Sequence, residues 1–268
     1  MINYFISIIW DYIFFKIEDL RYYKKISDIP LGYGSTEPVE GTSAHSWLGY
    51  RFAGIDPLTG HTLALVDNSH RKNPIGFLRE DGSYVLDMDD QSNRKDIRLI
   101  KEVLGDSYPP ISGGFGTTFT WKQLVLNGSF VFMAGHKISA AYYSVAGTGT
   151  VSAAAKNVMK QEANRWRKPG DITNMPGYNI SGMSSSLQTD WYDRKLENGN
   201  YLKCSEISLG YFFPSKICRK LMLQSLRINF NARDVFTITN YQGADPENFG
   251  GFGIPNSRKY MISINVGI

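Results

Sequence analysis

The end of the chain alternates between two kinds of side chain. Every second position of 260–268 is large and apolar: Tyr260, Ile262, Ile264, Val266 and Ile268. The positions between them are mostly small or polar: Met261, Ser263, Asn265 and Gly267. Because successive side chains of a β-strand point to opposite faces, this segment predicts a strand with one apolar face and one mostly polar face. Such a strand is typical of an outer-membrane β-barrel, which contacts lipid on one side and a water-filled lumen on the other.

The same two-residue period predicts further strands upstream. Residues 201–213 and 222–236 alternate in the same way, with a short turn between them and a long loop rich in Gly, Asp and Pro, 237–257, before the final strand. Each new strand reverses the direction of the chain if neighbours pair antiparallel. The last third of the chain therefore predicts three consecutive antiparallel strands.

A tight hairpin is predicted earlier, where Phe and Trp alternate with Gly and Thr over 112–122 and Leu and Phe alternate over 124–136. Only Lys122 and Gln123 separate the two patterns. Each arm has about ten residues, close to the 9–11 that a tilted membrane strand needs. This hairpin adds two spanning strands.

The connections between the predicted strands sort by length. Short turns fall at one end, which we assign to the periplasm, and the long segments 40–111, 138–200 and 237–257 fall at the other, as in outer-membrane barrels. We expect a small hairpin around Asp81-Gly82 and a short helix near 93–104 in the first segment, and an amphipathic helix over 151–166 in the second. The predicted organisation is an atypical segment 1–39, a loop region 40–111, and barrel strands with their loops over 112–268.

The N-terminal segment and the two cysteines limit the alternatives. Residues 4–15 are apolar but too short for a spanning helix and unlike a signal peptide, so we expect either an extra strand or a packed helix, and a chain that is part of something longer. Cys204 and Cys218 flank one predicted strand at roughly 30 Å, so free thiols are predicted.

Composition and motifs exclude several classes of function. The net charge of +4 comes without a dense Lys or Arg cluster, so no nucleic-acid partner is predicted. The four histidines never fall at metal-ligand spacing, and no nucleophile motif or cofactor loop is complete, so we predict no metal, no cofactor, no catalytic residue and no enzyme. The alternative left open is a soluble β-sandwich that binds carbohydrate, in which the apolar faces would pack on a second sheet.

Five phrases of the sequence, in order, resemble the C-terminal part of SusC/RagA-type TonB-dependent transporters. They are 50–60 (YRFAGIDPLTG), 110–122 (PISGGFGTTFTWK), 164–171 with Pro176 (NRWRKPGD), 197–214 (ENGNYLK through LGYFFP), and 231–247 (NARDVFTITNY through GADPE). The motif positions, for which the resemblance implies a structural role, are Gly54, Asp56, Pro57, Gly113, Gly114, Arg165, Trp166, Asn231, Asp245, Pro246 and Glu247.

The resemblance implies the terminal strands of a 22-stranded barrel, within the range of about 8 to 26 strands known for such barrels. It also implies import of oligosaccharides or other nutrients across the outer membrane, and a SusD-like lipoprotein lid. Contact with the TonB complex would come only from an N-terminal part that this chain lacks. Trp166 and Trp191, in predicted external loops, are the candidates for ligand or lid contact. The predicted fold is an all-β, antiparallel partial transmembrane barrel with long external loops and a short loop helix, contacting membrane lipid and unable to transport alone.

Overall fold

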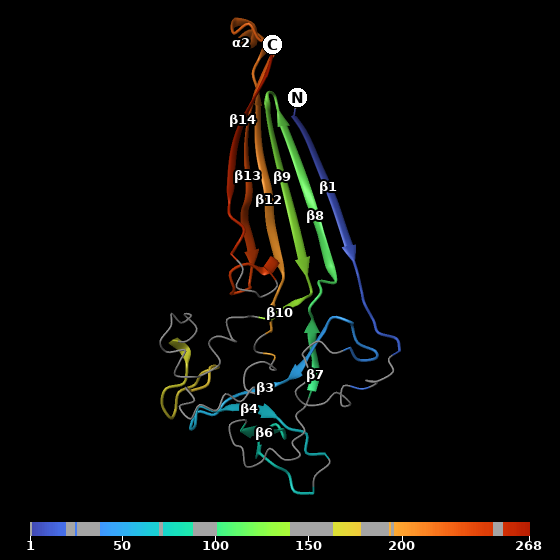
Figure 1. Cartoon of the computed structure of the whole chain (residues 1–268), viewed down its shortest axis with the longest axis vertical. Helices are drawn as coiled ribbons and strands as arrows, with labels where there is room; N and C mark the ends of the chain where they lie inside the picture. Colours follow the sequence, from blue (N-terminus) through green and yellow to red (C-terminus); the bar gives the residue numbers. More distant parts are fainter. Residues whose placement is uncertain are drawn as a thin grey trace.

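A computed structural model describes residues 2–19, 25, 38–69, 72–87, 101–139, 163–177, 193, 196–248 and 254–268. Its main feature is one sheet of six long strands (Figure 1). In spatial order the strands are β1 (Ile2–Tyr12), β8 (Ile111–Trp121), β9 (Leu124–Ala134), β12 (Tyr201–Phe212), β13 (Ser225–Thr239) and β14 (Lys259–Gly267).

Spatial order and chain order coincide in this sheet, and every neighbouring pair is antiparallel. Because the number of strands is even, both chain termini lie at the same end of the sheet, the upper end in Figure 1. We call this the turn end, since the connections there are short. The opposite end, where the chain forms its folded loops, is the loop end. The all-β, antiparallel prediction is confirmed.

The two connections at the turn end have different structures. Lys122 and Gln123 join β8 to β9 in a two-residue turn in which Lys122 has a φ of 54°. The connection from β12 to β13 contains the helix α2 (Ser215–Lys220), which follows Pro214. A short turn was predicted there, and the connection is short but holds one helix, with Pro214 in an extended conformation as its N-cap.

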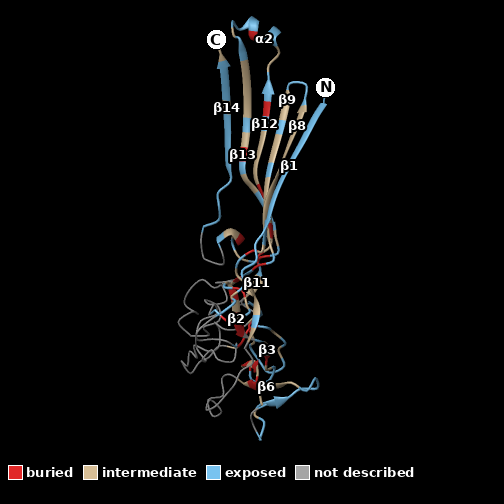
Figure 2. Cartoon of the chain, turned by 90° about the vertical axis from the view of Figure 1, so that its right-hand side faces the viewer, coloured by how far each residue is buried: buried red, intermediate tan, exposed pale blue. Residues whose placement is uncertain are grey.

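The loop end contains three small sheets. β2 (Ser46–Tyr50) pairs with β7 (Lys101–Asp106), and β10 (Lys137–Ser139) pairs with β11 (Leu196–Asn198). The third sheet has the order β3 (Phe52–Ile55), β4 (Thr62–Leu65), β6 (Tyr84–Asp87) and β5 (Phe77–Leu78). Figure 2 shows most of the buried residues here, whereas β1 and β14 are exposed along their lengths. The buried apolar side chains include Val39, Leu48, Ala64, Val66, Leu86 and Ile138.

Two helix predictions are wrong for the residues that the structure describes. Residues 101–104 of the helix expected near 93–104 belong to strand β7, because Leu48 and its neighbours in β2 pair with them. Residues 163–166 of the helix expected over 151–166 are a 3₁₀ turn and an isolated bridge between Arg165 and Met175. The remainder of both segments, 93–100 and 151–162, lies outside the described residues. Within those residues, no helix is long and apolar enough to cross a membrane.

Candidate functional site

The six-stranded sheet has one continuous apolar face. Cross-strand register brings six large apolar side chains into a single row, one from each strand: Tyr4, Phe119, Leu126, Leu209, Phe230 and Ile262. Among the described residues no second layer covers this face, since Tyr4 is 62% and Ile262 71% exposed. A soluble sandwich would bury these side chains against another sheet. The uncovered face therefore suits hydrocarbon rather than a sandwich core.

The opposite face is polar along most of its width. One row on this face carries Ser7, Gly116, Ser129, Glu206, Arg233 and Lys259. In the next row, Thr118 Oγ1 donates to Asn127 Oδ1 at 2.8 Å and Asn127 Nδ2 donates to Ser208 Oγ at 3.0 Å. These hydroxyl and amide groups line a hollow of about 180 Å³. The polar face is therefore built to be hydrated.

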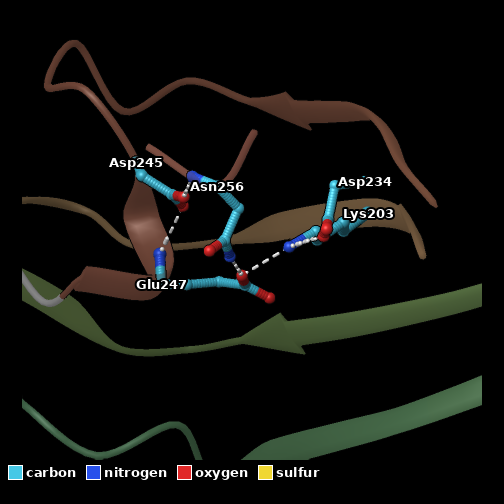
Figure 3. Close-up of polar contacts among 5 residues, drawn as sticks. All are labelled: Lys203, Asp234, Asp245, Glu247 and Asn256. Atoms are coloured by element: carbon cyan, nitrogen blue, oxygen red, sulfur yellow. Dashed lines mark hydrogen bonds and ion pairs between the residues drawn. The ribbon is translucent and has the colours of Figure 1, made fainter. Parts of the chain in front are cut away.

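A charged cluster lies where this polar face meets the loop end (Figure 3). Lys203 Nζ lies 2.7 Å from Asp234 Oδ1 and 2.6 Å from Glu247 Oε2, and its side chain is 8% exposed. Asn256 Nδ2 donates to the same Glu247 oxygen at 3.1 Å. One lysine thus joins β12, β13 and the loop that leads to β14.

A β-bulge brings Asp234 into this cluster. Between Cys204 and Glu206 the pairing of β12 with β13 moves from Phe236 to Arg233, so β13 holds one extra residue. Asp234 occupies the bulge with a φ of 52°, a conformation that Asp tolerates better than most residues. Bulges redirect side chains out of the regular alternation. Here the bulge directs the Asp234 carboxylate to Lys203.

The motif residues Asp245, Pro246 and Glu247 form the loop side of the cluster. The Glu247 amide donates to Asp245 Oδ1 at 3.0 Å. Pro246 is buried and is the first residue of a 3₁₀ turn, η6 (Pro246–Asn248). The loop and the strands enclose a hollow of about 190 Å³ that Lys203 and Asp234 also line. Asp245 therefore holds the loop in shape, and Glu247 joins the loop to Lys203.

Two other motif segments, 56–60 and 165–170, are hydrogen-bonded to each other although more than a hundred residues separate them. We call this contact the loop clasp. Trp166 Nε1 donates to the Pro57 carbonyl at 2.9 Å, and the Gly170 amide donates to the same oxygen at 2.8 Å. The Trp166 ring leaves no room for a Cβ at Gly60, whose φ is 74°. The loop at 56–60 is itself shaped by Asp56, whose carboxylate accepts from the Leu58 amide at 2.9 Å.

Arg165 stabilises the loop clasp through a buried hydrogen bond to the segment that follows it. Its side chain is buried, at 4% exposure, and its guanidinium donates to the Pro176 carbonyl at 2.8 Å. Trp166 itself is half-buried. Its predicted contact with ligand or lid stays a prediction, as does that of Trp191, which lies outside the described residues.

The remaining motif positions either permit a particular backbone geometry or lie on the polar face. A Cβ on Gly113 would lie 2.6 Å from the Ile9 carbonyl oxygen, so this glycine lets β1 approach β8. A Cβ on Gly114 would lie 2.9 Å from the Phe130 carbonyl oxygen. Gly54 has a φ of 109°, which a side chain would strain. Asn231 lies on the polar face, opposite Ser208.

Burial shifts the pKa values of several titratable groups at the junction between the sheet and the loops. Burial lowers the pKa of His136, which is 1% exposed. Burial also raises the pKa of the Glu197 carboxyl, although the Gln242 amide donates to it at 2.9 Å and partly offsets the shift. Burial and the nearby Glu197 raise the pKa of Tyr241. These groups are therefore part of a packed junction between β11 and the loop after β13.

Sequence reasoning missed Lys203 and Asp234, the centre of the charged cluster. A partial signal was present, because Lys203 and Asp234 are two of the few charged residues inside these predicted strands. Cys204 and Cys218 are both free and buried, and the first lies near the loop end of β12 whereas the second is in α2.

These features define a class of protein. An antiparallel meander with an exposed apolar face, a hydrated polar face, short turns at one end and folded loops at the other is the wall of an outer-membrane β-barrel.

Comparison with known proteins agrees with that class, although no family model matches the chain. The chain is 24% identical over 208 residues to TonB-dependent receptor P3 of Formosa agariphila, covering 78% of this chain and 19% of the relative. TonB-dependent receptor P39 of the same organism is 23% identical over 177 residues, covering 62% of this chain and 17% of the relative. The relatives are receptors rather than enzymes.

Solved structures share the fold across nearly the whole chain. The RagAB peptide transporter matches with a TM-score of 0.71 at 24% identity, covering 99% of this chain and 27% of that one. The RagAB peptide importer in its closed-closed state matches with a TM-score of 0.73 at 24% identity over the same shares. The predicted resemblance to SusC/RagA-type TonB-dependent transporters is confirmed, and the chain is a partial β-barrel of the outer membrane. It spans about a fifth of the length of the curated relatives.

Proposed function

We propose that this chain forms the C-terminal part of the barrel wall of a TonB-dependent importer, with its loop end outside the cell. The observation that carries the proposal is the two-faced sheet. Its apolar row is exposed, as lipid contact requires, and its polar row is lined with hydroxyl, amide and charged groups, as a hydrated lumen requires. In this organisation 1–39 adds a strand to the wall, while the loop segments within 40–111, 138–200 and 237–257 form the external mouth.

We propose further that the chain does not transport alone. Among the described residues, β1 and β14 each have one neighbour in the sheet, so each has an edge without a partner strand there. The six strands in the described part of this sheet are fewer than the eight of the smallest membrane barrels. Unpaired backbone groups within a membrane cost several kcal/mol each, which favours pairing with further strands over an open edge.

The proposed cargo is an oligosaccharide or another nutrient, and the proposed partner at the mouth is a SusD-like lipoprotein lid. The polar face supports such cargo, since its hydroxyl and amide groups can exchange hydrogen bonds with a hydrated solute. The loop clasp of Trp166 on Pro57 supports a stable outer mouth on which a lid could rest.

Disulfide trapping tests whether the chain closes by itself. Ser7→Cys and Ser263→Cys place thiols on the polar faces of the two edge strands, while Thr118→Cys and Asn127→Cys place them on paired neighbours as a control. We expect the control pair to crosslink in detergent-solubilised monomers and the edge pair not to. A monomer in which the edge pair crosslinks, and which conducts ions as a discrete pore, would refute the proposal that the chain needs other strands.

Labelling of intact cells tests the orientation. Ile254 at the loop end is 92% exposed and Ile268 at the turn end is 90% exposed, so Ile254→Cys and Ile268→Cys are a matched pair. We expect a membrane-impermeant maleimide to label the first variant and not the second. Labelling of Ile268→Cys alone would reverse the orientation, and recovery of the chain in the soluble fraction would contradict the membrane location.

A further inference from the structure

The helix α2 presents an unusual surface at the turn end of the sheet. Ile217, Leu221 and Met222 are large apolar residues that are 41%, 53% and 89% exposed. Arg219 and Lys220, in the last turn of the helix, are exposed beside them. Exposed apolar side chains interleaved with cations are typical of segments that lie in a membrane interface.

This end of the sheet is also free of acidic residues. The described residues 2–10, 107–139, 207–233 and 254–268 contain no Asp or Glu, although the chain has 25 of them. The cations at this end are Lys122, Lys216, Arg219, Lys220 and Arg227. The turn end therefore carries a one-sided positive charge.

Local packing holds α2 at the turn end of β12. Cys218, at 2% exposure, is the buried residue of the helix, and its Sγ lies 3.6 Å from the Phe213 carbonyl oxygen. Phe213 in turn meets Tyr211 edge-on, with ring centroids 5.0 Å apart. Tyr211 is in register with Leu124 and Ile228 on the apolar face. Phe213 therefore connects α2 to the edge of the face assigned to lipid.

The end of α2 keeps Met222 pointing away from the helix. The Leu223 amide donates to the Cys218 carbonyl at 2.9 Å and the Met222 amide to the Arg219 carbonyl at 3.1 Å, which is the Schellman pattern. Met222 occupies its left-handed position with a φ of 57°, where glycine is the usual residue. A large apolar side chain is thus displayed at a position whose backbone would favour Gly.

We propose that α2 lies on the membrane surface at the turn end and binds the headgroups of anionic phospholipids. Arg219 and Lys220 contact the phosphates, and Ile217, Leu221 and Met222 enter the boundary with the acyl chains. The proposal rests on the membrane-spanning sheet of the proposed function. Charge complementarity selects anionic lipid as the occupant, since a one-sided positive surface attracts anionic headgroups.

A fluorophore on Ser215→Cys, an exposed position at the start of α2, reports the contact in the full chain, because Cys204 and Cys218 are buried. The chain is refolded into phosphatidylcholine vesicles with increasing phosphatidylglycerol, and lipids that carry a quencher in the headgroup measure proximity. We expect quenching to rise with phosphatidylglycerol and to weaken with added salt. Neutralising a cation should lower the attraction about fivefold.

Two variants with two neutralised cations are matched. Arg219→Gln with Lys220→Gln removes the pair on α2, while Arg167→Gln with Lys168→Gln removes an adjacent exposed pair at the loop end. Only the first should lose the dependence on phosphatidylglycerol. Met222→Gly should reduce quenching while raising the thermal stability of the chain, a combination that simple unfolding of α2 would not produce.

Tryptophan quenching by brominated lipids separates the two proposals. Trp10 and Trp121 lie on the apolar face and are 64% and 49% exposed. If these tryptophans are quenched but the label on α2 is not, the α2 proposal is overturned and the spanning sheet stands. If neither is quenched, the sheet does not insert by itself, and the α2 proposal, which rests on an inserted sheet, is overturned. Quenching of the label that is the same with and without phosphatidylglycerol would also overturn headgroup recognition.

Discussion

Replacing Lys203 with methionine should loosen the loop after β13 while leaving the six-stranded sheet intact. The substitution keeps a long apolar stem but removes the ammonium group that lies 2.7 Å from Asp234 and 2.6 Å from Glu247. Two carboxylates then face each other without a cation in a site where the lysine was 8% exposed. The substitution therefore lowers the stability of the loop by more than the loss of an ordinary surface ion pair would.

The magnitude follows from the burial of the three groups. Removing one partner of a fully buried pair costs about 3–5 kcal/mol, because the other charge is left uncompensated. Both carboxylates here are 26% exposed, so water can solvate part of their charge. We therefore expect about 2–3 kcal/mol of local stability to be lost, just below the range for a fully buried pair.

Hydrogen exchange at the Glu247 amide, which donates to Asp245, measures this loss in the detergent-solubilised chain. If the loop opens locally, protection should fall roughly 30- to 150-fold. Arg233→Met is the matched control. It breaks the pair with Glu206 at 3.3 Å on the same two strands, but the two side chains are 55% and 37% exposed, so about 0.5 kcal/mol or less is expected.

A double-mutant cycle completes the test. Lys203→Met and Glu247→Gln should be less than additive, with a coupling of about 1–2 kcal/mol because the side chains touch. Equal small effects of Lys203→Met and Arg233→Met, or a coupling near zero, would refute the claim that the lysine holds the loop to the sheet.

Three further predictions concern the backbone and pH. Gly113→Ala should weaken the pairing of β1 by about 1–3 kcal/mol through overpacking. Gly116→Ala should be tolerated, because its Cβ would lie 3.2 Å from the Ser7 hydroxyl and 3.7 Å from the Gly128 carbonyl oxygen. Protease sensitivity of β1 measures the difference. His136 has a pKa lowered from 6.5, so the stability from its neutral form is complete above pH 6.5 and is lost as the pH falls through the lowered folded value. Exchange at the Gly199 amide, which donates to the His136 carbonyl, should therefore accelerate in acid, and His136→Phe should flatten that response. Lys122→Gly should raise the melting temperature by relieving about 1 kcal/mol at a φ of 54°; a lower value would contradict the strain.

The sequence alone determined five of the six long strands, their faces and the end at which each turn falls. The alternation of Ile262 and Ile264 with Ser263 and Asn265 is a local property of an extended chain, so it needs no knowledge of the neighbours. The predicted arms and the Lys122-Gln123 turn match β8 and β9 to within two residues at their ends. The first strand was harder to predict because Phe5 and Ile9 make β1 apolar on the polar face as well.

Only the tertiary structure decided which residues meet. Lys203 and Glu247 are 44 residues apart in the chain, and Trp166 and Pro57 are 109 residues apart. Their contacts depend on cross-strand register, on the bulge at Asp234 and on how the loops fold over the end of the sheet. A two-residue period carries none of this information, because register and bulges arise from pairing between strands.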